Sequence, residues 1–262
     1  MKTFRFIGMA LFAILMCVNF ASCSSSDDDP TEGPEEGDVV VSGKKLTKIT
    51  GTYDGEVETY SFNYDNNGRV IKAEYKEDNY TETYQFIWGD DAIRVSWTYT
   101  GSTSNYSCTL SLKNGLVQHE DYGEALKGTF SYNSSNKLAR FTDGEDWTVS
   151  TIWDGDKLVS ISNEDADATL TYENKSCKKG YFPFLASMIE PGESYILYMA
   201  HPEIAGMRTN QLPTNLTWTD NYGSETSTFT YEFDKEGYIS KIVGEETFNG
   251  STETYTYTLT WE

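Results

Sequence analysis

Seven segments of this chain share one arrangement, in which an alternating run ends on a large apolar residue and a polar turn follows. Within each run the apolar residues recur at every second position, as in an antiparallel strand with one buried face. From Tyr64 to Tyr172 the residues that end the runs are 24, 24, 20, 21 and 19 positions apart, a spacing typical of repeats. The pattern predicts an all-β fold, an antiparallel up-and-down meander of repeated hairpins. The turns lie at Tyr64–Val70, Trp88–Ile93, Leu112–Leu116, Tyr132–Leu138, Trp153–Leu158, Tyr172–Lys175 and Phe233–Ile239.

The strands that return from the turns follow a different rule, with one apolar residue at the start and another three positions later. Leu138 and Phe141 form one such pair, and Leu158 and Ile161 form another. A spacing of three is out of phase with a flat strand. It predicts a β-bulge after each turn, which adds twist and curls the sheet. We therefore expect a rolled or barrel-like sheet. By the same count His119 takes a core position, which favours a structural histidine over a catalytic base.

The first 22 residues have the features of an export signal. Lys2 and Arg5 give a positive start, residues 7–18 form an apolar run, and small residues precede Cys23. The apolar run is short for a membrane-spanning helix, which needs about 20 residues. The segment before Cys23 resembles a bacterial lipobox, which implies cleavage before Cys23 and acylation of that residue. We predict a signal peptide at 1–22 and a membrane anchor through the lipid on Cys23.

An acidic segment without apolar residues before Val39 follows the predicted cleavage site, and it cannot form a core. We predict a disordered tether at 23–43 and a single hairpin-repeat domain at 44–262. The Ser and Asp cluster after Cys23 resembles the signal that carries lipoproteins of Bacteroidota to the outer face of the outer membrane. The predicted localisation is therefore the outer membrane, lipid-anchored and facing the cell exterior, with the periplasmic face as the alternative.

The charge balance limits the partners. The chain has 41 Asp and Glu against 20 Lys and Arg, for a formal net charge of −21 at pH 7. Nucleic acid and anionic lipid are bound through basic patches that neutralise phosphate, so the composition argues against both. We expect the membrane contact to be the lipid anchor alone. A glycan or a surface protein remains as a partner.

One segment interrupts the repeat. Residues 180–213 hold four of the six prolines and two apolar runs, and they lie in a 61-residue interval between Tyr172 and Phe233. Long insertions of this kind are often functional. We expect a short helix at 184–189 and a cap over one open end of the rolled sheet, with a plug that completes the core as the alternative. The predicted ligand-binding residues are Tyr181, Phe184, Tyr195, Tyr198, His201 and Arg208.

Three tryptophans, Trp97, Trp147 and Trp218, lie outside the repeated position that explains Trp88, Trp153 and Trp261 as core residues. An exposed indole can stack on a sugar ring. Cross-strand aromatic pairing is the commoner use of such rings. We include these three tryptophans among the candidate ligand-binding residues and keep both interpretations.

Catalytic and metal-binding motifs are missing from the sequence. The acidic clusters fall in turns, where Asp and Asn bond their own backbone, and no Gly-x-Ser-x-Gly segment occurs. Asp154 and Asp156 resemble a fragment of a calcium loop without completing one. Cys108 and Cys177 lack the Cys-x-x-Cys spacing of redox or zinc sites. We predict no catalytic residues, no metal and no cofactor, and favour a non-catalytic protein over an enzyme.

The aromatic, Asp-x-x-Gly and aliphatic pattern is carried by Tyr64–Val70, Trp153–Leu158 and Phe233–Ile239, together with Leu212–Leu216 ahead of the last repeats. With the lipobox and acidic linker, it resembles an uncharacterised lipoprotein family of gut Bacteroidota, described as a domain of unknown function with a porin-like fold. The hairpins also resemble the tyrosine-aspartate repeats of bacterial wrapping shells. The resemblance implies a rolled β-sheet and brings no catalytic residues. We predict a surface-exposed outer-membrane lipoprotein with a non-catalytic binding or structural role; the alternative is a glycan-binding or carbohydrate-active module associated with polysaccharide uptake.

Overall fold

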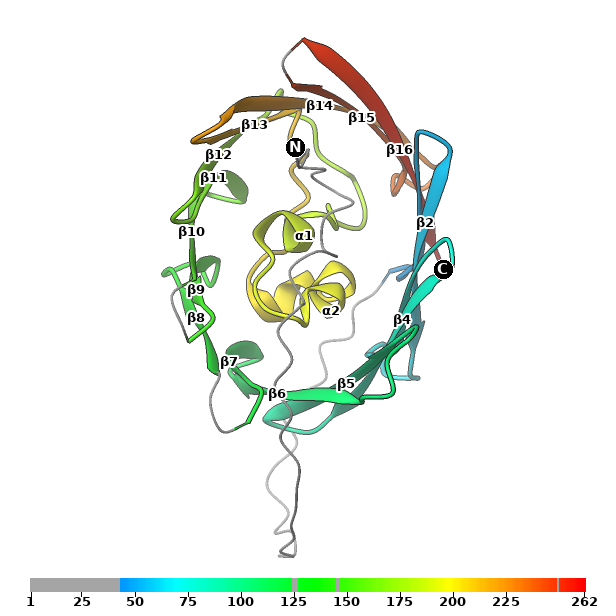
Figure 1. Cartoon of the computed structure of the whole chain (residues 1–262), viewed down its shortest axis with the longest axis vertical. Coiled ribbons are helices and arrows are strands. Elements are labelled where there is room, and N and C mark those ends of the chain that lie inside the picture. The colour runs from blue at the N-terminus through cyan, green and yellow to red at the C-terminus, as the bar shows by residue number, and fades with distance from the viewer. Residues whose placement is uncertain (1–42, 124–126, 145–146, 249) are drawn as a thin grey trace, which may run out of the picture. The chain divides into compact units, whose positions relative to one another are not determined.

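The computed structural model describes residues 43–123, 127–144, 147–248 and 250–262. These residues form a closed barrel of 16 antiparallel strands, in which each strand pairs with its neighbours in sequence and β1 pairs with β16 (Figure 1). The all-β meander and its closure into a barrel-like sheet are therefore confirmed. The predicted signal peptide, Cys23 and nearly all of the tether lie outside the described residues. The strands are β1 (Leu46–Tyr53), β2 (Glu56–Tyr64), β3 (Val70–Glu77), β4 (Tyr80–Trp88), β5 (Ala92–Tyr99), β6 (Tyr106–Lys113), β7 (Leu116–Asp121), β8 (Lys127–Tyr132), β9 (Leu138–Thr142), β10 (Thr148–Asp154), β11 (Lys157–Ser162), β12 (Ala166–Thr171), β13 (Asn215–Asp220), β14 (Gly223–Phe233), β15 (Ile239–Phe248) and β16 (Ser251–Trp261).

The predicted bulges occur on five return strands, β3, β7, β9, β11 and β15. In each of them the pairing register shifts just after the turn, so that one residue is left without a partner on the opposite strand. This placement increases the local twist at the same end of each hairpin, and it helps to close the barrel. The extra residues are Ile71, Gln118, Ala139, Val159 and Ser240.

The core assignment of His119 is wrong by one residue. The β6–β7 turn consists of Asn114 and Gly115 alone, both with positive φ, and Leu112 pairs with Val117. The core position three residues after Val117 is therefore Glu120, which is fully buried, whereas His119 is only half-buried. Leu116 pairs with Lys113 directly beside the two-residue turn, so the first core residue of β7 is Val117 and not Leu116.

Aromatic residues near the ends of the even-numbered strands tie neighbouring hairpins together. In seven of them the ring N–H or hydroxyl donates to a backbone carbonyl at or just before the beginning of the preceding strand, at 2.5 to 2.8 Å. Phe233 has no polar hydrogen and is 43% exposed, and Tyr231 makes the bond of its hairpin instead. The repeated turn pattern is thus a structural motif of the barrel wall. The donors are Tyr64, Trp88, Tyr132, Trp153, Tyr172, Tyr231 and Trp261.

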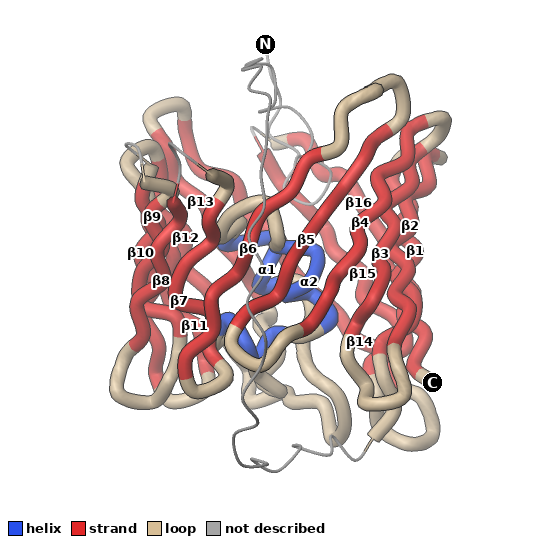
Figure 2. The backbone as a smooth tube through the Cα atoms, turned by 90° about the horizontal axis from the view of Figure 1, so that it is seen from below, coloured by secondary structure: helices blue, strands red, loops and turns tan. Residues whose placement is uncertain are grey.

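The insertion lies inside the barrel (Figures 1 and 2). It forms helix α1 (Leu185–Ile189), helix α2 (Tyr195–Ala200) and the 3-10 helix η1 (Pro202–Ala205). The short helix expected at 184–189 is confirmed, but the cap expected over one end is not what the structure shows. All residues of α1 and α2 are buried. A helix that is apolar on every side has to be enclosed on every side, which only the barrel lumen provides.

The outer wall is polar over the described strands. The outward positions of β16 are Thr252, Thr254, Thr256, Thr258 and Thr260, and those of the other strands are mainly Thr, Ser and charged residues. Lipid-facing strands carry an outward apolar band, so this wall is suited to contact with water. Separately, the described part of the chain holds no helix with the length and apolar character needed to cross a membrane.

Candidate functional site

The four aromatic residues predicted as ligand-binding in the insertion are buried in the lumen. Tyr181, Phe184, Tyr195 and Tyr198 are each 8% exposed or less. The Tyr181 hydroxyl donates to the carbonyl of Ala200 at 2.8 Å. The Phe184 and Tyr198 rings lie against wall aromatics, with ring centroids 4.6 and 5.9 Å apart. In this arrangement the four rings complete the core of the barrel.

His201 and Arg208 belong to a group that fastens the insertion to the wall. The backbone N–H of Val70 donates to His201 Nε2 at 3.1 Å, so Nδ1 carries the proton and donates to Glu203 Oε1 at 2.8 Å. Burial raises the pKa of Glu203, but the His201 bond and the Arg208 guanidinium outweigh it and hold that pKa below its usual value. Arg208 also lies over the Tyr181 ring, 5.1 Å from its centroid. Each polar atom of His201 is engaged, which indicates a structural role.

The three candidate tryptophans occupy separate parts of the wall. Trp97 on β5 is 7% exposed and stacks between Tyr84 and Tyr106, at centroid distances of 6.1 and 5.8 Å. Trp147 precedes β10, and Trp218 lies on β13 opposite Ala168. Several strands separate β5, β10 and β13 in the barrel order. The fold therefore does not bring these indoles together into one platform.

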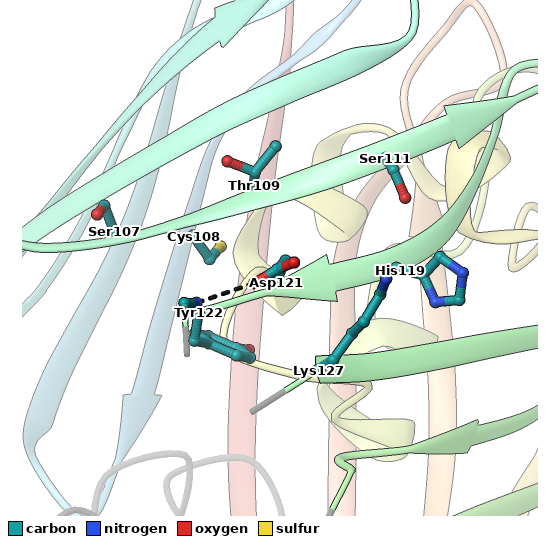
Figure 3. Close-up of a pocket in the computed structure, with 9 residues that line it drawn as sticks. Ser107, Cys108, Thr109, Ser111, His119, Asp121, Tyr122 and Lys127 are labelled. Carbon is teal, nitrogen blue, oxygen red and sulfur yellow. Dashed lines mark hydrogen bonds between the residues drawn. The ribbon is translucent and has the colours of Figure 1, made fainter. Parts of the chain in front are cut away.

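A pocket of about 500 Å³ opens in the wall where β6, β7 and β8 meet (Figure 3). We call it the wall pocket. Its lining is polar, with hydroxyls along β6, a carboxylate and an imidazole from β7, and an ammonium group from β8. The buried Ser111 Oγ has no hydrogen-bond partner among the described residues, and it remains able to bond a ligand. The lining residues are Ser107, Cys108, Thr109, Ser111, His119, Asp121, Tyr122, Gly123 and Lys127.

Behind the floor of the wall pocket lies the buried carboxylate of Glu120. It accepts hydrogen bonds from the backbone N–H and the hydroxyl of Ser194, at 3.0 and 2.6 Å, and from the Cys108 thiol at 3.4 Å. Burial raises the pKa of Glu120 to about 7. Since Ser194 immediately precedes α2, this contact fixes one end of the helix to the wall, while His201 fixes the other.

The wall pocket is equipped for hydrogen bonding rather than for catalysis. Burial and the nearby Glu120 carboxylate raise the pKa of the Cys108 thiol, so it stays protonated and unreactive. Cys108 and Cys177 are both free and buried. Among the described residues no three His, Cys, Asp or Glu side chains are grouped to hold a metal ion. The sequence did not predict this site because the repeat count placed His119 in the core, whereas His119 lines the wall pocket. The Asn114-Gly115 turn was the signal for the correct register.

A comparison with solved structures finds porin-like proteins from two Bacteroides species. The crystal structure of a porin-like protein from Bacteroides uniformis matches with a TM-score of 0.65 and 19% sequence identity, over 83% of this chain and 96% of that chain. One from Bacteroides vulgatus matches with a TM-score of 0.42 and 13% identity, over 84% of this chain and 99% of that chain. No protein-family model matches the sequence, and no curated protein does. The likeness to the Bacteroides uniformis protein supports the barrel fold, while membership of the lipoprotein family stays a prediction.

Proposed function

We propose that this chain is a surface-exposed outer-membrane lipoprotein in which a plugged barrel serves a non-catalytic binding or structural role. The observation that carries the proposal is the combination of a polar outer wall with a lumen occupied by α1 and α2. A wall of this kind faces water, and a lumen filled with side chains is not a channel. Membrane attachment then falls to the lipid on Cys23. The porin-like fold of the Bacteroides uniformis protein fits an origin in the outer membrane.

The anchor is tested by replacing Cys23 with Ala. Acylation needs the Cys23 thiol, so we expect the variant to remain an unacylated precursor that incorporates no labelled palmitate. Cys108→Ser is the matched control, because that thiol is buried in the barrel and cannot carry the lipid; it should keep the label. Persisting label in the Cys23→Ala protein would refute the anchor.

A glycan-binding role is the second candidate, and the wall pocket favours it. Hydroxyl, carboxylate, imidazole and ammonium groups line the wall pocket together with Tyr122, and such groups bond sugar hydroxyls while the ring covers an apolar sugar face. A glycan array probed with the Cys23→Ala protein tests this candidate. Weaker binding signals from the His119→Ala and Lys127→Ala variants would support a glycan-binding role. An array without any binding signal would rule that role out.

A further inference from the structure

Three buried glutamates lie at one end of the barrel, each as the third residue of an even-numbered strand and away from the turn that follows that strand. Glu58, Glu82 and Glu225 are each 9% exposed or less. They belong to strands β2, β4 and β14, which lie within one run of seven adjacent strands from β14 through β16 and β1 to β4. We call this group the glutamate belt and define it by Glu58, Glu77, Glu82, Glu225, Glu246 and the accompanying Tyr255.

Glu58, Glu77 and Glu82 bond hydroxyl groups instead of cations, and Glu225 and Glu246 interact with each other. Glu58 accepts from the hydroxyls of Tyr60 and Tyr75, both at 3.4 Å, and Tyr75 also donates to Glu77 at 2.9 Å. Glu82 accepts from two further tyrosines at 2.6 and 2.8 Å. The ion pairs formed between described side chains include none of the five belt glutamates.

The lack of a countercharge affects the protonation of the belt. Burial raises the pKa of Glu58 to about 7, with a further increase from Glu77. Burial raises the pKa of Glu225 to about 8, with contributions from Glu246 and Asp220. Tyrosine hydroxyls face Glu58, and on the side of the insertion the buried Glu193 lies near Glu82. Around neutral pH the belt therefore holds protons that a bound cation could replace.

A second observation at the belt is an unsatisfied hydroxyl. Tyr255 is 5% exposed, and its hydroxyl has no hydrogen-bond partner among the described residues; the nearby Ser227 hydroxyl does not reach bonding geometry. An added Cβ at Gly244 would be 2.1 Å from the Tyr255 ring, and burial together with the nearby charges of Glu246 and Glu225 raises the pKa of the Tyr255 hydroxyl. A buried polar group without a partner is costly, and a ligand donor placed there would satisfy it.

We propose that the glutamate belt is a binding site for an organic polycation, with a linear polyamine as the chemical class. The acceptors are spread over seven adjacent strands, which lie about 4.8 Å apart, so they match charges distributed along a chain better than one metal ion. No three acidic, His or Cys side chains of the described residues converge on a metal position. Tyrosine rings beside carboxylates favour ammonium groups through cation–π contacts and hydrogen bonds. This site is separate from the wall pocket and from the lipid anchor.

The test uses the full chain with Cys23→Ala and isothermal titration with spermine at pH 8 and pH 5.5. We expect binding at pH 8 with release of protons, and affinity about tenfold or more lower at pH 5.5, where Glu58 and Glu225 hold their protons. Mg²⁺ at the same ionic strength should bind more weakly than spermine by a similar factor. Equal affinity for Mg²⁺, affinity that does not change with pH, or no spermine binding would each overturn the proposal.

Two variants assign the binding to the belt. Replacing both Glu225 and Glu246 with Gln should lower spermine affinity about tenfold, equivalent to about 1.4 kcal/mol. Glu232→Gln is the matched control, because Glu232 lies on the same strand, is exposed and pairs with Lys241; its affinity should not change. Unchanged affinity in the double variant would place the site elsewhere and overturn the proposal.

Unfolding without ligand provides the check that the double variant folds. The raised pKa of Glu225 means that the folded state binds more protons than the unfolded chain between about pH 4.5 and 8, so stability is present at low pH and declines as pH rises through this range. The double Gln variant should melt cooperatively with a smaller decline. If the double variant does not fold, the single variant Glu246→Gln takes its place in the titration, because it changes only a half-buried side chain. Unchanged spermine affinity in that variant would likewise overturn the proposal.

Discussion

Deletion of residues 180–213, bridged by a short Gly-Ser linker, is expected to abolish cooperative folding of the barrel. The deleted segment supplies more than ten buried apolar side chains to the lumen, including Phe182, Phe184 and Tyr198. Each contributes about 1.5 to 3 kcal/mol when buried. Their loss exceeds the net stability of about 5 to 15 kcal/mol that is typical of a folded domain. Circular dichroism should show no cooperative thermal transition.

The matched control places the same Gly-Ser linker in the β13–β14 turn at Tyr222, which is 86% exposed. That turn contributes no core residue, so the melting temperature of the control variant should stay within a few degrees of that of the parent protein. If the deletion variant instead melts cooperatively near the parent temperature, the insertion does not complete the core. A folded deletion variant that has lost a ligand would then assign the insertion a binding role.

Replacing Trp153 with Ala is expected to destabilise the protein by about 3 kcal/mol or more, towards the lower end of the range for large aromatic truncations. The indole N–H donates to the carbonyl of Leu138 at 2.7 Å, and Lys137 lies 5.2 Å from the ring centroid. The substitution leaves that carbonyl without this donor and removes the ring that joins two hairpins. Urea denaturation at pH 7 measures the loss.

Two neighbouring variants make the Trp153 result specific. Ile152 points outward and is 62% exposed, so Ile152→Ala should change stability by less than about 0.5 kcal/mol. Trp153→Phe keeps the ring and removes the N–H, and it should cost about 1 kcal/mol. If Trp153→Ala were as mild as Ile152→Ala, the repeated aromatic bond would not be a structural motif at this hairpin.

Hairpins and bulges were predictable from the sequence because both are local. Alternation over a few residues determines which face of a strand is buried, and the spacing of three after each turn marks the bulge, as at Leu138 and Phe141. The register error at His119 shows the limit of this local reasoning. The count of three began at Leu116, but Leu116 pairs with Lys113 and the first core residue after the turn is Val117, so the count ends on Glu120.

The location of the insertion was harder to predict, because a cap and a plug need the same apolar residues. What distinguishes them is that α2 is apolar on every side, from Tyr195 to Ala200, whereas a cap would keep one polar face for water. The glutamate belt did leave a signal. Glu58 and Tyr60, and Glu82 and Tyr84, stand two residues apart, which places each carboxylate on the same face as a core ring.

The central claim is that the barrel has a water-facing wall and a lumen filled by the insertion. Its most direct test is sedimentation of residues 24–262, which lack the predicted signal peptide and the anchor, in detergent-free buffer, together with conductance recordings after the protein is added to a planar lipid bilayer. We predict a non-aggregated, β-rich species and no channel conductance. Aggregation that only detergent or lipid relieves, accompanied by stable single-channel currents, would contradict the claim.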